Sequence, residues 1–284
     1  MHDLLNDLTK YVYGETCFRL GVDNVEGQKV PKTTRHFSTT TEPTKYNEYR
    51  SLCEAKALRT FITIGDFGNS IHELISNFKF LRLLSLSRCW NIKEVLGVIV
   101  DFIHLRSIDL SFTNTNRLPN SICSLYNLQV LMLNKCPYLK KLPSTLHELT
   151  KLRRLELMGT SLRKAPVLLG KLKNLLQVWI SKFEVDKSSS ELSVQQLGDL
   201  DLYGKLTITN LQNIRNPCDA LTADLKNKIH LVGLDLKWNL KLNNDESVKE
   251  REVLENLDPS SHLKHLSISV YCGRQFECGV LKLV

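Results

Sequence analysis

The chain has 284 residues, of which 42% are apolar, and a formal net charge of +8. This length suffices for a large buried core, and no stretch reaches the about 20 consecutive apolar residues of a membrane-spanning helix. The basic residues are dispersed without interleaved aromatic side chains, so nucleic acid is not expected as a partner; the charge indicates a solvated surface, with peripheral contact to a membrane or to an acidic domain as the alternative.

The first 30 residues contain no repeated pattern. Between residues 3 and 12, leucines and a valine recur at helical spacing, which predicts an amphipathic helix. Residues 31–57 then lead toward the first repeat and are predicted to form a linker and a capping strand.

The phrase L-x-x-L-x-L-x-x-(N/C/T) recurs along most of the remaining chain. A degenerate copy begins at Leu58, and looser copies begin at Tyr203, Leu231 and Leu263. The clear copies, 23 or 24 residues apart, begin at Leu81, Leu105, Leu128, Leu152 and Leu175. This period is typical of leucine-rich repeats, in which each unit buries its leucines against its neighbours.

Each copy predicts a short strand followed by a turn. Leu131 and Leu133 lie two residues apart and therefore face the same side, inward, whereas Met132 and Asn134 face outward. The ninth residue of the phrase is small and polar or a thiol, and we expect it to hydrogen-bond the backbone where the chain leaves the strand. The residues at this position are Cys89, Thr113, Cys136, Thr160 and Asn239.

Leucine–proline phrases follow the strands, as at Leu118-Pro119, and suit an irregular return because proline donates no backbone hydrogen bond. The predicted fold class is therefore α/β, a leucine-rich-repeat solenoid with a curved parallel sheet on its concave face and an irregular or short helical convex side. Insertions at 184–200 and 240–257 stretch the period. The first is predicted to be an exposed loop, and the second to end in a short helix that docks on the convex side through Val253, Leu254 and Leu257.

The outward strand positions predict a continuous concave binding surface, because neighbouring strands stand about 4.8 Å apart. Phe112, Met132, Met158 and Trp179 are predicted to form an apolar strip with a charged rim, as in protein interfaces. The alternative is that solenoid strands merely tolerate scattered exposed apolar residues. The predicted protein-binding residues are Asp109, Phe112, Val130, Met132, Lys135, Arg154, Glu156, Met158, Gln177, Trp179 and Lys182.

No catalytic or metal motif is complete. His72-Glu73 and His147-Glu148 would begin a zinc-protease motif, but Ser76 and Lys151 stand where its second histidine is required. We therefore expect no enzyme activity and no metal. The cysteines are scattered and no Asn-x-Ser/Thr glycosylation site occurs, which predicts free thiols and a cytoplasmic location.

The opening Met1-His2-Asp3 resembles the motif that closes the nucleotide-binding NB-ARC module of plant intracellular resistance proteins. Further phrases, up to about Phe276, resemble the coiled-coil type of these NB-ARC leucine-rich-repeat proteins. They are Lys32-Thr-Thr-Arg-His-Phe-Ser38, Ala57-Leu-Arg-Thr-Phe61, Leu118-Pro-x-Ser-Ile-Cys123, Gly204-Lys-Leu-Thr-Ile208, Leu225-Lys-Asn-Lys228 and Arg251-Glu-Val-Leu254.

The resemblance implies roles for the first residues. In the family, the histidine approaches the phosphates of bound ADP and the aspartate helps to hold the resting state, which would assign these roles to His2 and Asp3. No Gly-x-x-x-x-Gly-Lys-Ser/Thr phosphate loop occurs in the chain. We therefore expect no cofactor in this chain, and ADP or ATP only in a full-length family member.

The resemblance also implies a domain division and a function. Residues 1–30 would be the C-terminal remnant of the NB-ARC module, 31–57 the linker and capping strand, 58–276 the leucine-rich-repeat domain and 277–284 a divergent tail. The chain would be the recognition and autoinhibition region of an intracellular immune receptor. Its partner would be a pathogen effector, a guarded host protein or its own NB-ARC domain. A generic leucine-rich-repeat scaffold and a nonfunctional truncated gene remnant are the alternatives.

Overall fold

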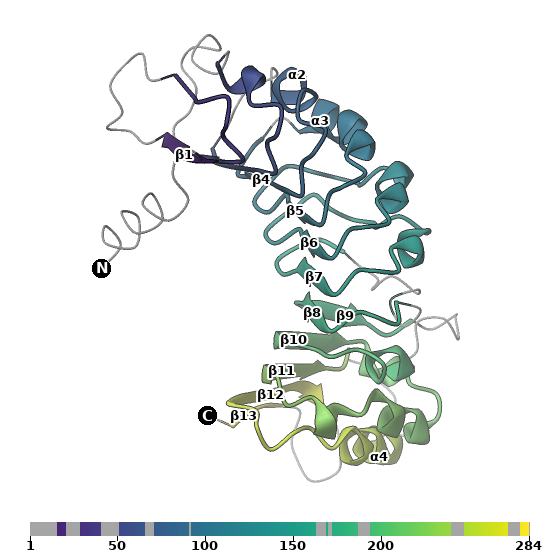
Figure 1. Cartoon of the computed structure of the whole chain (residues 1–284). Coiled ribbons are helices and arrows are strands. Elements are labelled where there is room, and N and C mark those ends of the chain that lie inside the picture. The colour runs from purple at the N-terminus through teal and green to yellow at the C-terminus, as the bar shows by residue number, and fades with distance from the viewer. Residues whose placement is uncertain are drawn as a thin grey trace.

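The computed structural model describes residues 16–20, 29–40, 51–65, 71–90, 92–162, 169, 172–186, 194–239, 247–271 and 279–283. The chain forms an elongated, curved array with its strands along the inner, concave side and its helical turns along the outer, convex side (Figure 1). This is the predicted α/β leucine-rich-repeat solenoid. The amphipathic helix predicted over residues 3–12 lies outside the described residues, as do residues 187–193 of the first insertion.

An eight-stranded sheet, parallel throughout, forms the first part of the concave face, and its strands follow one another in chain order. They are β1 (Cys17–Leu20), β2 (His36–Thr39), β3 (Thr60–Ile64), β4 (Leu83–Ser87), β5 (Ser107–Asp109), β6 (Val130–Met132), β7 (Arg154–Leu157) and β8 (Gln177–Ile180). Strands β3 to β8 confirm the strand predicted for each copy of the phrase that begins between Leu58 and Leu175.

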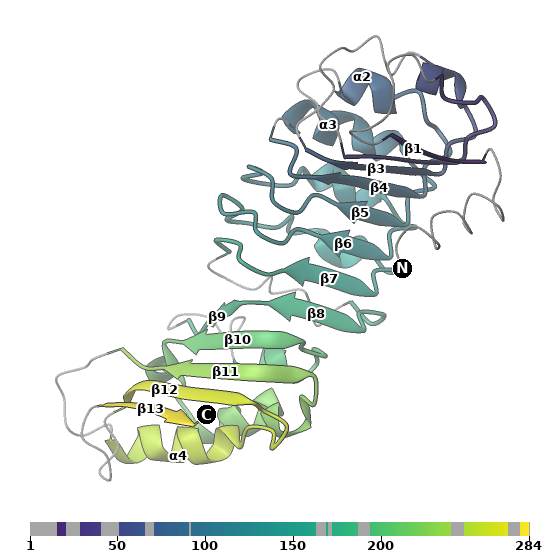
Figure 2. The ribbon, with the colours of Figure 1, turned by 90° about the vertical axis from the view of Figure 1, so that its left-hand side faces the viewer.

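The second sheet continues the array (Figure 2). Its order is β13-β12-β11-β10-β9, and only the pairing of β12 with β13 is antiparallel. The strands are β9 (Lys182–Glu184), β10 (Gly204–Thr209), β11 (Leu231–Lys237), β12 (His265–Tyr271) and β13 (Gly279–Leu283). Strands β10 to β12 confirm the three looser copies, whereas the phrase predicted neither β9 nor β13.

The leucine phrase does not predict the first two strands, because phenylalanine takes the place of leucine on their inward side. Phe18, Phe37 and Phe61 align across β1, β2 and β3. Their ring centroids are 6.2 Å and 5.6 Å apart, and Phe78 stacks on Phe61 at 6.2 Å. The inward row continues through Leu84, Ile108, Leu131 and Leu155, each fully buried.

The ninth residue of the phrase makes the expected backbone contacts. The Cys89 thiol donates to the Gly65 carbonyl at 2.8 Å, and the Thr113 hydroxyl donates to the Leu110 carbonyl at 2.9 Å. The Cys136 thiol also donates to the Leu110 carbonyl, at 3.2 Å. The side chain thus satisfies a carbonyl that the turn leaves without a strand partner.

The convex side consists of short helices and 3-10 turns. The helices are α2 (Ile71–Ile75), α3 (Lys93–Val98) and α4 (Ser247–Leu257), and the turns are η4 (Ile99–Asp101), η5 (Asn120–Ser124), η6 (Leu146–Glu148), η9 (Val194–Leu197), η10 (Leu211–Asn213), η11 (Pro217–Ala223) and η12 (Leu225–Asn227). Val253 and Leu257 of α4 are buried, and α4 packs against η11, which confirms the helix predicted in the second insertion. Within the described part of the chain, no helix is long and apolar enough to span a membrane.

The eighth residue of the phrase has positive φ in five successive repeats, and we call this set the edge column. Its members are Gly65 (133°), Arg88 (66°), Phe112 (61°), Lys135 (55°) and Gly159 (68°). The backbone N–H of each of the first four donates to the carbonyl just before the next member, with distances of 3.2 Å (Gly65 to Ser87), 3.0 Å (Arg88 to Ser111), 2.7 Å (Phe112 to Asn134) and 2.6 Å (Lys135 to Met158). The left-handed conformation therefore aims a backbone donor at the neighbouring repeat.

Candidate protein-binding surface

Two rows of outward side chains line the concave face of the eight-stranded sheet. They alternate along each strand with buried residues, as strand geometry requires. The register aligns Val130, Arg154 and Gln177 in the first row, and Asp109, Met132, Glu156 and Trp179 in the second. Seven of the eleven predicted binding residues therefore lie together on the strands.

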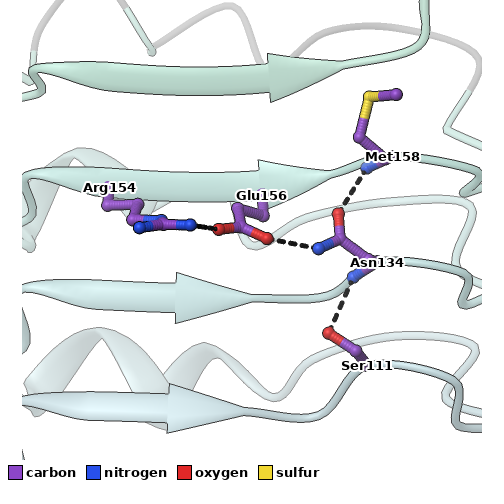
Figure 3. A network of polar contacts seen from close by, with 5 residues as sticks. All are labelled: Ser111, Asn134, Arg154, Glu156 and Met158. Carbon is purple, nitrogen blue, oxygen red and sulfur yellow. Dashed lines mark hydrogen bonds and ion pairs between the residues drawn. The ribbon is translucent and has the colours of Figure 1, made fainter. Parts of the chain in front are cut away.

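The other four lie elsewhere. Phe112 and Lys135 belong to the edge column and lie after the ends of β5 and β6, whereas the sequence predicted them on strand positions. Met158 follows β7 in the position that Asn134 occupies after β6 (Figure 3). Lys182 begins β9 in the second sheet and pairs with Thr207 of β10.

A chain of hydrogen bonds crosses the concave face from β4 to β7. The Ser85 hydroxyl donates to Asp109 at 3.1 Å, and the Asp109 carboxylate accepts the Ser111 N–H at 2.9 Å. The Ser111 hydroxyl accepts the Asn134 N–H at 3.2 Å, and the Asn134 side-chain carbonyl accepts the Met158 N–H at 3.0 Å (Figure 3). These side chains tie four successive repeats together at the ends of their strands.

Glu156 is a member of this network and not a free surface charge. Its carboxylate accepts from the Asn134 side-chain amide and pairs with the Arg154 guanidinium, and the residue is only 7% exposed (Figure 3). This corrects the expectation that Glu156 is an exposed charge on the rim of the surface. A carboxylate that is buried and hydrogen-bonded on both sides stabilises the array instead.

The predicted apolar strip is also divided. The register places Glu156 between Met132 and Trp179, so a carboxylate that is ion-paired with Arg154 separates the two apolar residues. Phe112 lies outside both rows because its backbone is left-handed.

An aromatic stack extends the concave face across the junction of the two sheets. The Trp179 and Tyr203 ring centroids are 4.6 Å apart, and the Tyr203 and His230 rings stack at 4.3 Å with an interplanar angle of 8°. At the same junction, Val178 and Leu202 form a parallel bridge. We call Trp179, Tyr203 and His230 the junction stack. The sequence did not predict Tyr203 and His230 as surface residues, because Tyr203 occupies a position that a core leucine usually fills. An alignment of the residues that directly precede β10 and β11 would have identified Tyr203 and His230 as neighbours.

Four arginines directly precede strands β2 to β5, at the opposite ends of the strands from the edge column. They are Arg35, Arg59, Arg82 and Arg106, and we call this set the arginine column. The N–H of each later member donates to the carbonyl of the previous one, at 2.7, 2.7 and 2.8 Å. None of the four forms an ion pair with an acidic side chain of the described segments. Burial and the positive charges of Arg59 and Arg35 lower the pKa of His36, which hydrogen-bonds Thr60 at 2.9 Å.

The geometry defines a leucine-rich-repeat array, and a family described as "Leucine-rich repeat region" matches residues 57–278. The chain belongs to this family. A leucine-rich-repeat protein of Leptospira interrogans has the same fold, with a TM-score of 0.56 and 19% identity over 92% of this chain and 70% of that one.

Relatives by sequence are disease resistance proteins. Two proteins of Arabidopsis thaliana, both named as putative disease resistance proteins and one of them RPP13-like, are 41% identical to the chain over 97% of its length. The disease resistance protein RGA2 of Solanum bulbocastanum is 37% identical over 28% of the chain and 8% of its own length. The chain spans only 20% and 27% of the two Arabidopsis proteins.

His2 and Asp3 lie outside the described residues, so their nucleotide-sensing role stays a prediction for a full-length receptor. Across the described segments, no group of three or more histidine, cysteine, aspartate or glutamate side chains is arranged to hold a metal ion. The six described cysteines, Cys17, Cys53, Cys89, Cys123, Cys136 and Cys218, are free thiols.

Proposed function

We propose that this chain is the recognition and autoinhibition region of an intracellular plant immune receptor, and that it works in the cytoplasm by binding proteins. The 41% identity to disease resistance proteins over nearly the whole chain supports the role in disease resistance. The leucine-rich-repeat fold supports the mode of action, because stacked repeats create an extended concave surface suited to a protein partner.

The geometry of the junction stack is the main structural support for the proposal. Trp179 and Tyr203 are half-exposed, and the Arg154 guanidinium carbon lies 4.7 Å from the Trp179 ring centroid. Tryptophan, tyrosine and arginine are the residues that dominate binding energy at protein interfaces. Here they adjoin one another at the centre of the array, where both sheets contribute to the face.

Three proteins fit as partners: a pathogen effector, a guarded host protein and the receptor's own NB-ARC domain. ADP or ATP belongs to the preceding module of a full-length receptor.

A chimeric receptor tests the proposal. This chain would replace the matching region of the 41% identical Arabidopsis protein, and the cell-death response would be scored in leaves. We expect the double variant Trp179→Ala/Tyr203→Ala to change the response, either by loss of recognition or by constitutive activity. The control Tyr126→Ala, an exposed tyrosine off the concave rows, should leave the response unchanged. Equal responses from the wild-type chimera and the double variant, at equal protein levels, would refute the proposal.

A further inference from the structure

The edge column contains three large side chains where the backbone favours glycine. Arg88, Phe112 and Lys135 have φ between 55° and 66°, and the flanking members Gly65 and Gly159 are glycines. An L-residue with a bulky side chain is strained in this conformation, because Cβ approaches the following carbonyl oxygen. The backbone bonds of the column involve only N–H and C=O groups, so glycine would make them equally well.

Contacts within the protein do not offset this strain. The Arg88 guanidinium carbon lies 5.2 Å from the Phe112 ring centroid, a cation–π contact in open solvent, which is weak. Phe112 is 45% exposed. Lys135 is exposed and extends across Gly159, where an added Cβ would meet its Cδ at 2.8 Å. A strained backbone whose side chains stay exposed is characteristic of sites where those side chains serve function.

The surroundings of the column have the composition of a binding surface. Ile64 directly precedes Gly65, Trp90 follows Arg88 by two residues, and Tyr138 follows Lys135 by three. These side chains are exposed by 46%, 59% and 57% respectively. Exposed apolar side chains that lie close to cations along the chain are typical of surfaces that contact another protein.

The charge of this edge selects the kind of partner. Four of the five segments at this edge, 88–90, 112–116, 135–139 and 159–162, contain Arg88 and Lys135 but neither aspartate nor glutamate, and in the sequence Asp66 follows Gly65. A partner must therefore supply carboxylates, and it must also cover tryptophan, phenylalanine and tyrosine rings. A phosphate polyanion would satisfy the cations and leave the rings in water, so the combination favours an acidic protein segment.

We infer that the edge column, with Ile64, Trp90 and Tyr138, is a second protein-binding surface of this chain, which takes an acidic segment bearing apolar or aromatic side chains. It lies beside the concave rows and does not depend on the junction stack. Arg88 and Lys135 pair with carboxylates, and the Phe112 ring packs against an apolar side chain of the partner.

A random copolymer of glutamate and tyrosine serves as the probe, with polyglutamate and inorganic polyphosphate for comparison. The key variant is Arg88→Gly/Phe112→Gly/Lys135→Gly, which continues the glycines at either end of the column. We expect its melting temperature to equal or exceed that of the wild type. Its affinity for the copolymer, measured by titration calorimetry on the full chain, should fall by at least about tenfold.

Two controls make the result specific. Arg82→Gln/Arg106→Gln also removes two positive charges from neighbouring repeats, but on the opposite edge, and should weaken copolymer binding by no more than about twofold. Phe112→Gly alone should weaken binding of the copolymer and leave that of polyglutamate unchanged. Three results would each overturn the inference: a lowered melting temperature of the triple glycine variant, equal losses in the triple variant and the opposite-edge control, or polyphosphate binding as tight as that of the copolymer.

Discussion

The guanidinium carbon of Arg154 lies 4.7 Å from the centroid of the Trp179 ring, while the same guanidinium forms an ion pair with Glu156. One side chain therefore joins the polar network of the first sheet to the junction stack. The Arg154 side chain is thus shared by the buried carboxylate and the aromatic surface, and we expect a substitution at Arg154 to alter both.

The Asn134 side chain forms two hydrogen bonds within the polar network of the first sheet. Replacing it with alanine removes the acceptor of the Met158 N–H and the donor to the buried Glu156 carboxylate. We expect Asn134→Ala to lower the free energy of unfolding by about 2–3 kcal/mol, because buried groups lose hydrogen bonds. Urea unfolding measures the loss.

Asn127→Ala is the matched control, because the Asn127 side chain also forms hydrogen bonds to neighbouring repeats, but these bonds are exposed whereas those of Asn134 are partly buried. Its cost should stay under about 1 kcal/mol, since water replaces the lost bonds. Equal costs for the two variants would contradict a stabilising role for the network.

His36 should make stability depend on pH. Burial and the charges of Arg59 and Arg35 lower its pKa below 6.5 in the folded chain. Between that lowered pKa and 6.5, the unfolded chain binds more protons, so the contribution of His36 to the free energy of unfolding rises with pH. Urea unfolding of the wild type and of His36→Gln across this window should give a difference that grows with pH; a constant difference would show that His36 does not titrate differently on folding.

Two glycines should respond to alanine in opposite ways. At Gly198, an added Cβ would meet the Thr222 carbonyl oxygen at 2.3 Å, a clash with backbone that has little room to move. At Gly97, on helix α3, the structure leaves open space around the same atom. We expect Gly198→Ala to destabilise the chain by about 2 kcal/mol or more and Gly97→Ala to stabilise it by about 0.5–1 kcal/mol. Melting temperatures that move in the same direction would contradict the packing described at Gly198.

The aligned rings of Phe18, Phe37 and Phe61 predict where a substitution destabilises the N-terminal repeats most. Phe61 is fully buried and stacks on both Phe37 and Phe78. We expect Phe61→Ala to cost about 3–5 kcal/mol, whereas Phe80→Ala, at a site that is 56% exposed, should cost under about 1 kcal/mol. Calorimetric unfolding of both variants provides the test, and similar losses would mean that the aligned rings do not form the core of these repeats.

The repeat period predicted much of this architecture, because leucines at fixed spacing have one way to bury themselves: against the next repeat. The same period predicted the contacts of Cys89, Thr113 and Cys136. It did not reveal β1 and β2, in which Phe18 and Phe37 replace leucine. Nor did it reveal the burial of Glu156, which depends on how the Arg154 and Asn134 side chains converge on it. Positive φ at Arg88, Phe112 and Lys135 left no trace in the sequence, because these residue types rarely adopt that conformation.

The alternation of buried and half-exposed residues along each short strand has an evolutionary consequence. Val130 and Gln177 face the concave surface, while their chain neighbours Leu131 and Val178 hold the repeats together. A substitution at the first pair can change what the face recognises and leave the array folded. Single substitutions can therefore change the binding specificity of such an array during evolution while its fold is retained.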